Sequence, residues 1–201
     1  SDARYIVKGR PYQVAELVGS EEEAARYVGG RACVIYLSPR DYHRVHSPVD
    51  GDLVQIRSMP GDYFPVNDIG VKHVPNLFVR NRRVAFVIDT PNLGRVTAVM
   101  VSAMIVGRIT ATAVEAYDVP IGNHDFDPPV RVRRGDEIGV FHLGSTVVLF
   151  FEKKAAGSWI AKDGMIRYGA PLHEAQPNAK TNGAHSSRHH GPASGVPGAR
   201  T

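Results

Sequence analysis

The chain has 201 residues, enough for one domain with a hydrophobic core, and a formal net charge of +4. It contains no dense run of lysine and arginine, which argues against nucleic-acid binding, while a mildly basic surface suits anionic phospholipid headgroups. The single cysteine, Cys33, excludes an internal disulfide and a multi-cysteine zinc site. Because Cys33 lies in an apolar run, we expect a buried structural thiol.

The first predicted element is a short helix. Ser20 and Glu23 have the spacing of a capping box, which predicts a helix from Glu21 to Val28 that ends at Gly29-Gly30.

From residue 34 the pattern indicates strands, separated by glycine or proline. The β-branched and apolar segments are Val34–Leu37, Leu53–Arg57, Val84–Asp89, Val96–Met104 and Val147–Phe151. Val114–Asp118 and Val130–Val132 alternate like half-exposed strands, and Met100–Ile109 fits either a buried helix or a strand with a bulge at Gly107. The spacing predicts a mainly β (α+β) fold, an antiparallel β-sandwich or barrel-like sheet with one or two short helices.

The composition changes near Ala175. Pro, Gly, Ala, Ser, Asn and His dominate the remainder, which cannot bury enough apolar surface to offset its ordering entropy. We therefore predict one domain over residues 1–174 and a disordered tail over residues 175–201. Three tail histidines (His185, His189 and His190) could bind a metal, but the composition favours a solvated tail, and we predict no metal site.

Ionisable residues are concentrated in the loop Tyr36–Gly51, directly after a predicted strand. The loop places arginine, aspartate and histidine between two Ser-Pro pairs, which brings acid, base and anion-binding groups together. The structural alternative is a surface loop crossed by Asp–Arg ion pairs.

A second segment of interest is Leu143-Gly144-Ser145-Thr146, at the start of the last predicted strand. A serine hydroxyl can attack the carbonyl of the preceding residue, and glycine leaves that carbonyl sterically open. β-Elimination of the resulting ester would cut the chain and leave a pyruvoyl group. A Gly-Ser pair alone is a weak signal for this chemistry.

Together, the loop and the tetrad resemble the phosphatidylserine decarboxylases. Further matching segments follow in order between them: Pro60–Asn67, Val74–Asn81 and Arg134–Phe141. The likeness runs from about Gly9 to Phe151. It implies decarboxylation of phosphatidylserine to phosphatidylethanolamine through a Schiff base on a covalent pyruvoyl cofactor derived from Ser145.

The resemblance also implies a self-processing proenzyme. Cleavage between Gly144 and Ser145 would give an upstream chain of residues 1–144 and a downstream chain from residue 145, associated non-covalently. The other implied partners are phosphatidylserine in the membrane and a second copy in a homodimer, but no nucleic acid. The implied location is peripheral, on the cytoplasmic side of a bacterial inner membrane. Bacterial members carry additional N-terminal sequence, so we expect a fragment or a short form.

Site residues follow from the same resemblance. Asp41 matches the loop aspartate that works with a histidine to activate the serine, in the logic of nucleophile, base and orienter. We expect that histidine near Val84–Val96, where this chain has Asn92, which cannot take a proton. The base is therefore sought among the other histidines, foremost His43 and His46, with His73 and His142 as further candidates.

Arg40 or Arg44 is the candidate for binding the substrate phosphate, because guanidinium groups fit phosphate oxygens. Three alternatives remain: a decarboxylase of a related serine headgroup, a non-catalytic β domain that binds lipid or a partner, and a hydrolase. The hydrolase is least favoured because the sequence has no Gly-x-Ser-x-Gly motif.

Overall fold

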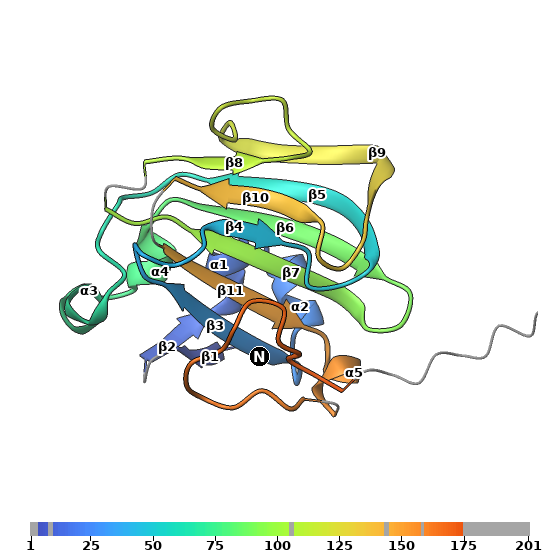
Figure 1. The fold of residues 1–201 in the computed structure, drawn as a ribbon, viewed down its shortest axis with the longest axis horizontal. Coiled ribbons are helices and arrows are strands. Elements are labelled where there is room, and N and C mark those ends of the chain that lie inside the picture. Colours follow the sequence, from blue (N-terminus) through green and yellow to red (C-terminus); the bar gives the residue numbers. More distant parts are fainter. Residues whose placement is uncertain (1–3, 8–9, 105–106, 143–144, 158, 175–201) are drawn as a thin grey trace, which may run out of the picture.

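The computed structural model describes residues 4–7, 10–104, 107–142, 145–157 and 159–174 (Figure 1). Antiparallel strands dominate it, with short helices at the periphery, so the predicted mainly β class is confirmed. The sheets form layers and do not close into a barrel. The predicted tail, residues 175–201, lies outside the described residues.

A six-stranded sheet forms the centre, in the order β3-β11-β7-β6-β5-β9. Its strands are β3 (Arg31–Leu37), β5 (Gly51–Met59), β6 (Arg83–Thr90), β7 (Gly94–Val101), β9 (Gly122–Val132) and β11 (Ser145–Phe151). β11 is buried along its whole length, as expected of an apolar run covered on both faces.

A smaller sheet, β4-β10-β8, lies in front of the central one in Figure 1, while α1 and α2 lie behind it. Its strands are β4 (Arg44–His46), β8 (Ile109–Ala111) and β10 (Glu137–Phe141), and a separate hairpin joins β1 (Arg4–Val7) to β2 (Arg10–Gln13). The helices are α1 (Val14–Val18), α2 (Glu21–Arg26), α3 (Asp68–His73), α4 (Leu77–Arg80) and α5 (Lys153–Ala156).

The predicted N-terminal helix is α2, and it is shorter than expected. Ser20 Oγ accepts the Glu23 N–H at 3.1 Å, as the predicted cap requires. The Glu23 side chain does not complete the capping box; it is buried and accepts the Tyr27 hydroxyl at 2.7 Å and Arg95 Nη1 at 3.0 Å. The helix ends at Arg26, two residues before the predicted Val28, where the Tyr27 N–H bonds the carbonyls of Ala24 and Ala25.

The prediction of a strand at Val114–Asp118 is wrong. Its backbone makes local bonds, Val114 N–H to Ala111 O and Ala116 N–H to Val114 O, so it forms turns instead of a ladder. The predicted strand Val96–Met104 ends at Val101, and the Met100–Ile109 alternative resolves into the end of β7 and the start of β8.

Cys33 is half-buried on the edge strand β3, where it packs against the core. The thiol is therefore less enclosed than predicted, although burial still raises its pKa.

Candidate functional site

Strand register brings Ser145, the first part of the Asp41 loop and the matching segment Pro60–Asn67 to one end of the central sheet. Ser145 pairs with Leu37, and the neighbouring pairs Thr146–Val101, Val101–Arg83 and Arg83–Met59 continue across the sheet to Ser58–Gly122. The described residues of the connections that leave this end are 38–43, 60–67, 81–82, 102–104, 107–108, 118–121 and 142. We call it the serine end; it lies to the left in Figure 1.

Ser145 is the first residue of β11 and has no solvent exposure. Its hydroxyl donates a hydrogen bond to the carbonyl of Val101 on the adjacent strand β7. Leu143 and Gly144, and with them the predicted scissile bond, lie outside the described residues. Ser145 is thus held by the sheet, with its hydroxyl bonded to a backbone acceptor.

The loop that contains Asp41 lies beside the end of β10, the strand that precedes Ser145 in the sequence. β3 pairs with β11, and β4 pairs with β10. The segment between β3 and β4 and the segment between β10 and β11 therefore connect the same two pairs of strands. The His43 carbonyl accepts the Phe141 N–H at 3.0 Å, which holds the two together. Two segments separated by about a hundred residues in sequence therefore share one site.

Asp41 is exposed and stabilises its own loop. Its Oδ2 accepts the Ser38 N–H at 2.7 Å, and its N–H donates to the Ser38 carbonyl at 2.9 Å. Among the hydrogen bonds of the described residues, the Asp41 carboxylate reaches Ser38 and not Ser145.

The four candidate histidines differ in their surroundings. His43 Nε2 is buried and has no hydrogen-bond partner among the described residues. His46 has both ring nitrogens engaged, with the Tyr42 hydroxyl at 2.8 Å and Gly135 O at 2.7 Å. His142 Nε2 lies 2.8 Å from Thr110 Oγ1, and His73 is exposed at the end of α3. Among these four histidines, His43 alone has a buried ring nitrogen without a hydrogen-bond partner among the described residues.

Asn92 lies at the wrong end of the sheet for a base. It belongs to the turn that joins β6 to β7, next to the Thr90–Gly94 pair, whereas Val101 at the other end of β7 contacts Ser145. Seven residues of extended strand separate the two ends by about 23 Å. The turn that contains Asn92 is therefore too far away to supply the base that activates Ser145.

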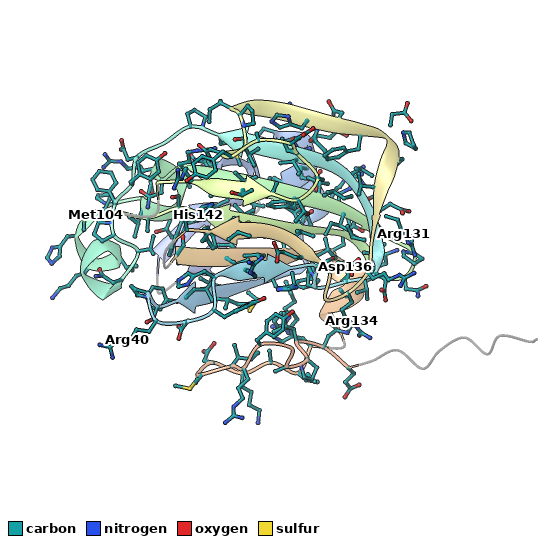
Figure 2. The ribbon with its side chains drawn as sticks, turned by 45° about the horizontal axis from the view of Figure 1, so that its top comes forward. Arg40, Met104, Arg131, Arg134, Asp136 and His142 are labelled. Carbon is teal, nitrogen blue, oxygen red and sulfur yellow. The ribbon has the colours of Figure 1, made fainter. Side chains whose placement is uncertain are left out.

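The two candidate phosphate-binding arginines also differ. Arg44 donates to Glu137 at 2.6 Å, and this bond raises the pKa of the guanidinium. Arg40 is exposed, and its guanidinium has no ion-pair partner among the described residues. Figure 2 shows Arg40 pointing away from the body of the protein at the serine end. Arg40 is thus the freer cation.

Three polar residues near Ser145, namely Ser102, Thr146 and Asn81, were not among the site residues expected from the sequence. Ser102 Oγ and Thr146 Oγ1 are buried without hydrogen-bond partners in the described part of the chain. Asn81 is fully buried; its Oδ1 accepts the Phe64 N–H at 2.9 Å, and its Nδ2 donates to the carbonyls of Phe64 and Ser102, each at 2.8 Å. Asn81 therefore holds loop 60–67 to the segment that follows Val101.

A hollow of about 420 Å³ opens between loop 60–67 and segment 118–121. Arg82 lies at its wall and is already saturated by the Val119 carbonyl at 2.6 Å, Ser58 Oγ at 3.0 Å and Asp118 Oδ1 at 3.0 Å. The remaining lining is largely apolar and consists of Pro60, Gly61, Tyr63, Val119, Pro120 and Ile121.

Among the described side chains, no group of three or more histidine, cysteine, aspartate or glutamate residues is placed to hold a metal ion. Within the same ranges, no helix has the length and apolar character needed to cross a membrane.

Comparison with known proteins agrees with the resemblance. The sequence profile of the family described as phosphatidylserine decarboxylase matches residues 1–172. The chain is similar to the phosphatidylserine decarboxylase proenzyme of Anaeromyxobacter sp. (strain K), with 40% identity over 177 residues, 82% of this chain and 61% of the relative. It is also similar to the proenzymes of Brevibacillus brevis (44% identity; 72% of this chain, 54% of the relative) and Vibrio cholerae (41% identity; 86% of this chain, 62% of the relative).

The chain therefore spans less than two thirds of the length of these curated relatives.

Proposed function

The chain belongs to the phosphatidylserine decarboxylase family, and from this premise we propose that it decarboxylates phosphatidylserine to phosphatidylethanolamine. One observation carries the proposal: the buried Ser145 begins a core strand beside the loop that bears Asp41 and His43. In this proposal Ser145 would be the nucleophile, His43 the candidate base and Asp41 the carboxylate of the site, supplied by two segments that are distant in sequence.

The chain would first cut itself between Gly144 and Ser145, as the name proenzyme carried by its relatives suggests. Ser145 Oγ would leave the Val101 carbonyl and attack the carbonyl of Gly144. β11 pairs with β3 along its whole length and with β7 from Thr146 to Phe151. The downstream chain would therefore remain in the sheet after the cut.

His43 is the base that the surroundings favour. Its buried Nε2 has no partner among the described residues, and its carbonyl already ties the loop to the strand before Ser145. His46 is the second candidate, because a bond from Nδ1–H to Gly135 O would leave Nε2 as the basic nitrogen. His43→Gln should slow self-cleavage far more than His46→Gln; the reverse order would assign the role to His46.

A pyruvoyl group derived from Ser145 would supply an electrophilic carbonyl that captures the substrate amine and accepts the electron pair released with carbon dioxide. The surroundings fit such a group. The hydroxyl of Ser102, which follows the Val101 carbonyl that Ser145 bonds, is buried without a described partner and is free to donate to a carbonyl oxygen. Its burial also keeps bulk water from this position.

Arg40 would bind the substrate phosphate, because it is exposed at the serine end and Arg44 is committed to Glu137. Replacing Arg40 by alanine should raise KM several-fold and leave self-cleavage unchanged. Arg44→Ala is the matched control, with a smaller effect on KM. Equal loss of self-cleavage and decarboxylation in Arg40→Ala would contradict this role.

The reaction itself is tested by carbon dioxide release from detergent-dispersed phosphatidylserine. The unmodified chain should release it, and Ser145→Ala should not. Release from a related serine headgroup such as archaetidylserine, but not from phosphatidylserine, would change the substrate. Absence of release from either would leave a lipid-binding domain without catalytic activity.

A further inference from the structure

Three ring side chains connect the C-terminal part of the chain with the loop that contains Asp41. The centroid of the Tyr168 ring lies 4.9 Å from that of His46 and 5.3 Å from that of Tyr42, and the rings of Tyr42 and His46 stack at 5.6 Å. We call these three residues the aromatic cluster. Tyr42 is 50% exposed and Tyr168 is 65% exposed, so the cluster lies at the surface and is not part of the hydrophobic core.

Hydrogen bonds fix the cluster on the side of the loop. His46 Nδ1 lies 2.7 Å from the Gly135 carbonyl oxygen, and His46 Nε2 lies 2.8 Å from the Tyr42 hydroxyl. Because a carbonyl oxygen can only accept, Nδ1 carries the proton, and Nε2 accepts the proton of the Tyr42 hydroxyl. The Tyr42 side chain is therefore tied through His46 to the turn that precedes β10.

Tyr168 comes from a segment whose base is anchored on the core. Segment 159–174 follows α5 and is drawn in orange-red in Figure 1. At its base the Ile160 N–H donates to the Leu172 carbonyl at 3.0 Å, and the Trp159 ring meets the Phe151 ring of β11 edge-on, with 5.5 Å between the centroids. The segment therefore leaves the core and returns to it, with Tyr168 in between.

A tight turn fixes the backbone at Tyr168. The Ala170 N–H donates to the Arg167 carbonyl at 3.0 Å, which closes a turn with Tyr168 and Gly169 in its centre. Gly169 has a φ of 79°, the left-handed conformation that the third residue of a type II turn requires. Among the hydrogen bonds, ion pairs and ring contacts of the described residues, only those of Tyr168 connect this turn with residues 38–43.

Tyr42 stands between two residues of the proposed site, because Asp41 precedes it and His43 follows it. The Asp41 carboxylate bonds only within its own loop, to the Ser38 N–H, among the hydrogen bonds of the described residues. The Tyr42 side chain is thus the side-chain link between residues 38–43 and the rest of the described protein. A restraint on the Tyr42 ring limits the motion of both neighbouring residues.

We propose that Tyr168 is a positioning residue for the chemistry at Ser145. Through its ring contacts with Tyr42 and His46 it holds loop 38–43, and with it Asp41 and His43, in place. This inference rests on the proposed function, which assigns the reacting groups. It adds that the downstream chain supplies, besides Ser145, a side chain that orders the loop of the upstream chain.

The contact is tested by amide hydrogen exchange in the Ser145→Ala chain, which stays in one piece. Tyr168→Ala should speed exchange in peptides that cover residues 38–43 at least about tenfold, because the loop loses its restraint and opens more often. Tyr168→Phe keeps the ring and should exchange within about twofold of the parent. Met165→Ala is the matched control in the same segment, because Met165 is fully exposed, and it should leave exchange in this loop unchanged.

With Ser145 restored, Tyr168→Ala should slow self-cleavage several-fold, and Tyr168→Phe should restore the rate. Tyr42→Ala combined with Tyr168→Ala should be no slower than Tyr42→Ala alone, because Tyr168 acts through Tyr42. The thermal unfolding midpoint of each variant is the control for folding. Unchanged exchange or unchanged self-cleavage in folded Tyr168→Ala, or additive losses in the double variant, would overturn the proposal. Exchange is measured in a chain that cannot cut itself, so a parent that fails to cleave would refute the proposed function and leave the exchange result to decide the contact.

Discussion

Asn81 offers the sharpest test of how the site is held together. Replacing it by alanine removes an amide that satisfies three backbone groups, the N–H and carbonyl of Phe64 and the carbonyl of Ser102. Asn81 has no solvent exposure, so water cannot replace these bonds without rearrangement. At about 1 kcal/mol for each buried group left unpaired, Asn81→Ala should lower the free energy of unfolding by about 3 kcal/mol.

The measurement is urea unfolding followed by fluorescence, in the Ser145→Ala background so that the chain stays in one piece. Asn92→Ala is the matched control, because Asn92 is exposed in a turn at the opposite end, and it should change stability by less than about 0.5 kcal/mol. With Ser145 restored, Asn81→Ala should also slow self-cleavage, since Ser102 follows the residue that holds the serine hydroxyl. A decrease of less than about 1 kcal/mol in the free energy of unfolding would refute the proposed role of Asn81 in holding loop 60–67 to the segment that follows Val101.

Three further predictions concern groups away from Ser145. Glu23→Gln should cost about 2 kcal/mol, because partly buried Arg57 and Arg95 lose the buried carboxylate that they share while Arg95 keeps Asp89, whereas Glu22→Gln on the exposed face should be neutral; equal effects in urea unfolding would contradict this. Arg95 lowers the pKa of Asp89, so the stability that Asp89 contributes is present above about pH 4 and is lost as the pH falls through the lowered pKa. Asp89→Asn should therefore cost less than about 1 kcal/mol at neutral pH, since the pair is partly exposed, and nothing at low pH; a difference that grows toward acid would contradict this sign. Burial raises the pKa of the Cys33 thiol, so alkylation at pH 8 should be several-fold slower in the folded chain than in urea, and equal rates would exclude this protection.

The strands predicted most accurately from the sequence are those buried on both faces, because their apolar runs can be recognised without knowing which strands they pair with. Val84–Asp89 and Val147–Phe151 are apolar runs buried on both faces, and they correspond to β6 and β11 within two residues at each end. β10 was missed because Gly139 interrupts its pattern. A side chain at Gly139 would collide with Met100 and Phe86, so this glycine allows close packing of two sheets and does not mark a turn.

The candidate site was likewise predicted only in part from the sequence. The resemblance identified Ser145 and the Asp41 loop, but local patterns carry no strand register, and register alone brings the two together. The same register places Asn92 far from Ser145, against the sequence-based expectation. Ser102 and Asn81 had no distinguishing local signal, since their importance comes from burial and from backbone groups distant in sequence.

The central claim is that this chain cuts itself at Ser145 and uses the product for decarboxylation. Its most direct test is the intact mass of purified chain that releases carbon dioxide from phosphatidylserine, before and after treatment with borohydride. We expect two components, residues 1–144 and residues 145–201, the second lacking a free amine and gaining mass on reduction. A single uncut chain in an active preparation, or carbon dioxide release by Ser145→Ala, would contradict the claim.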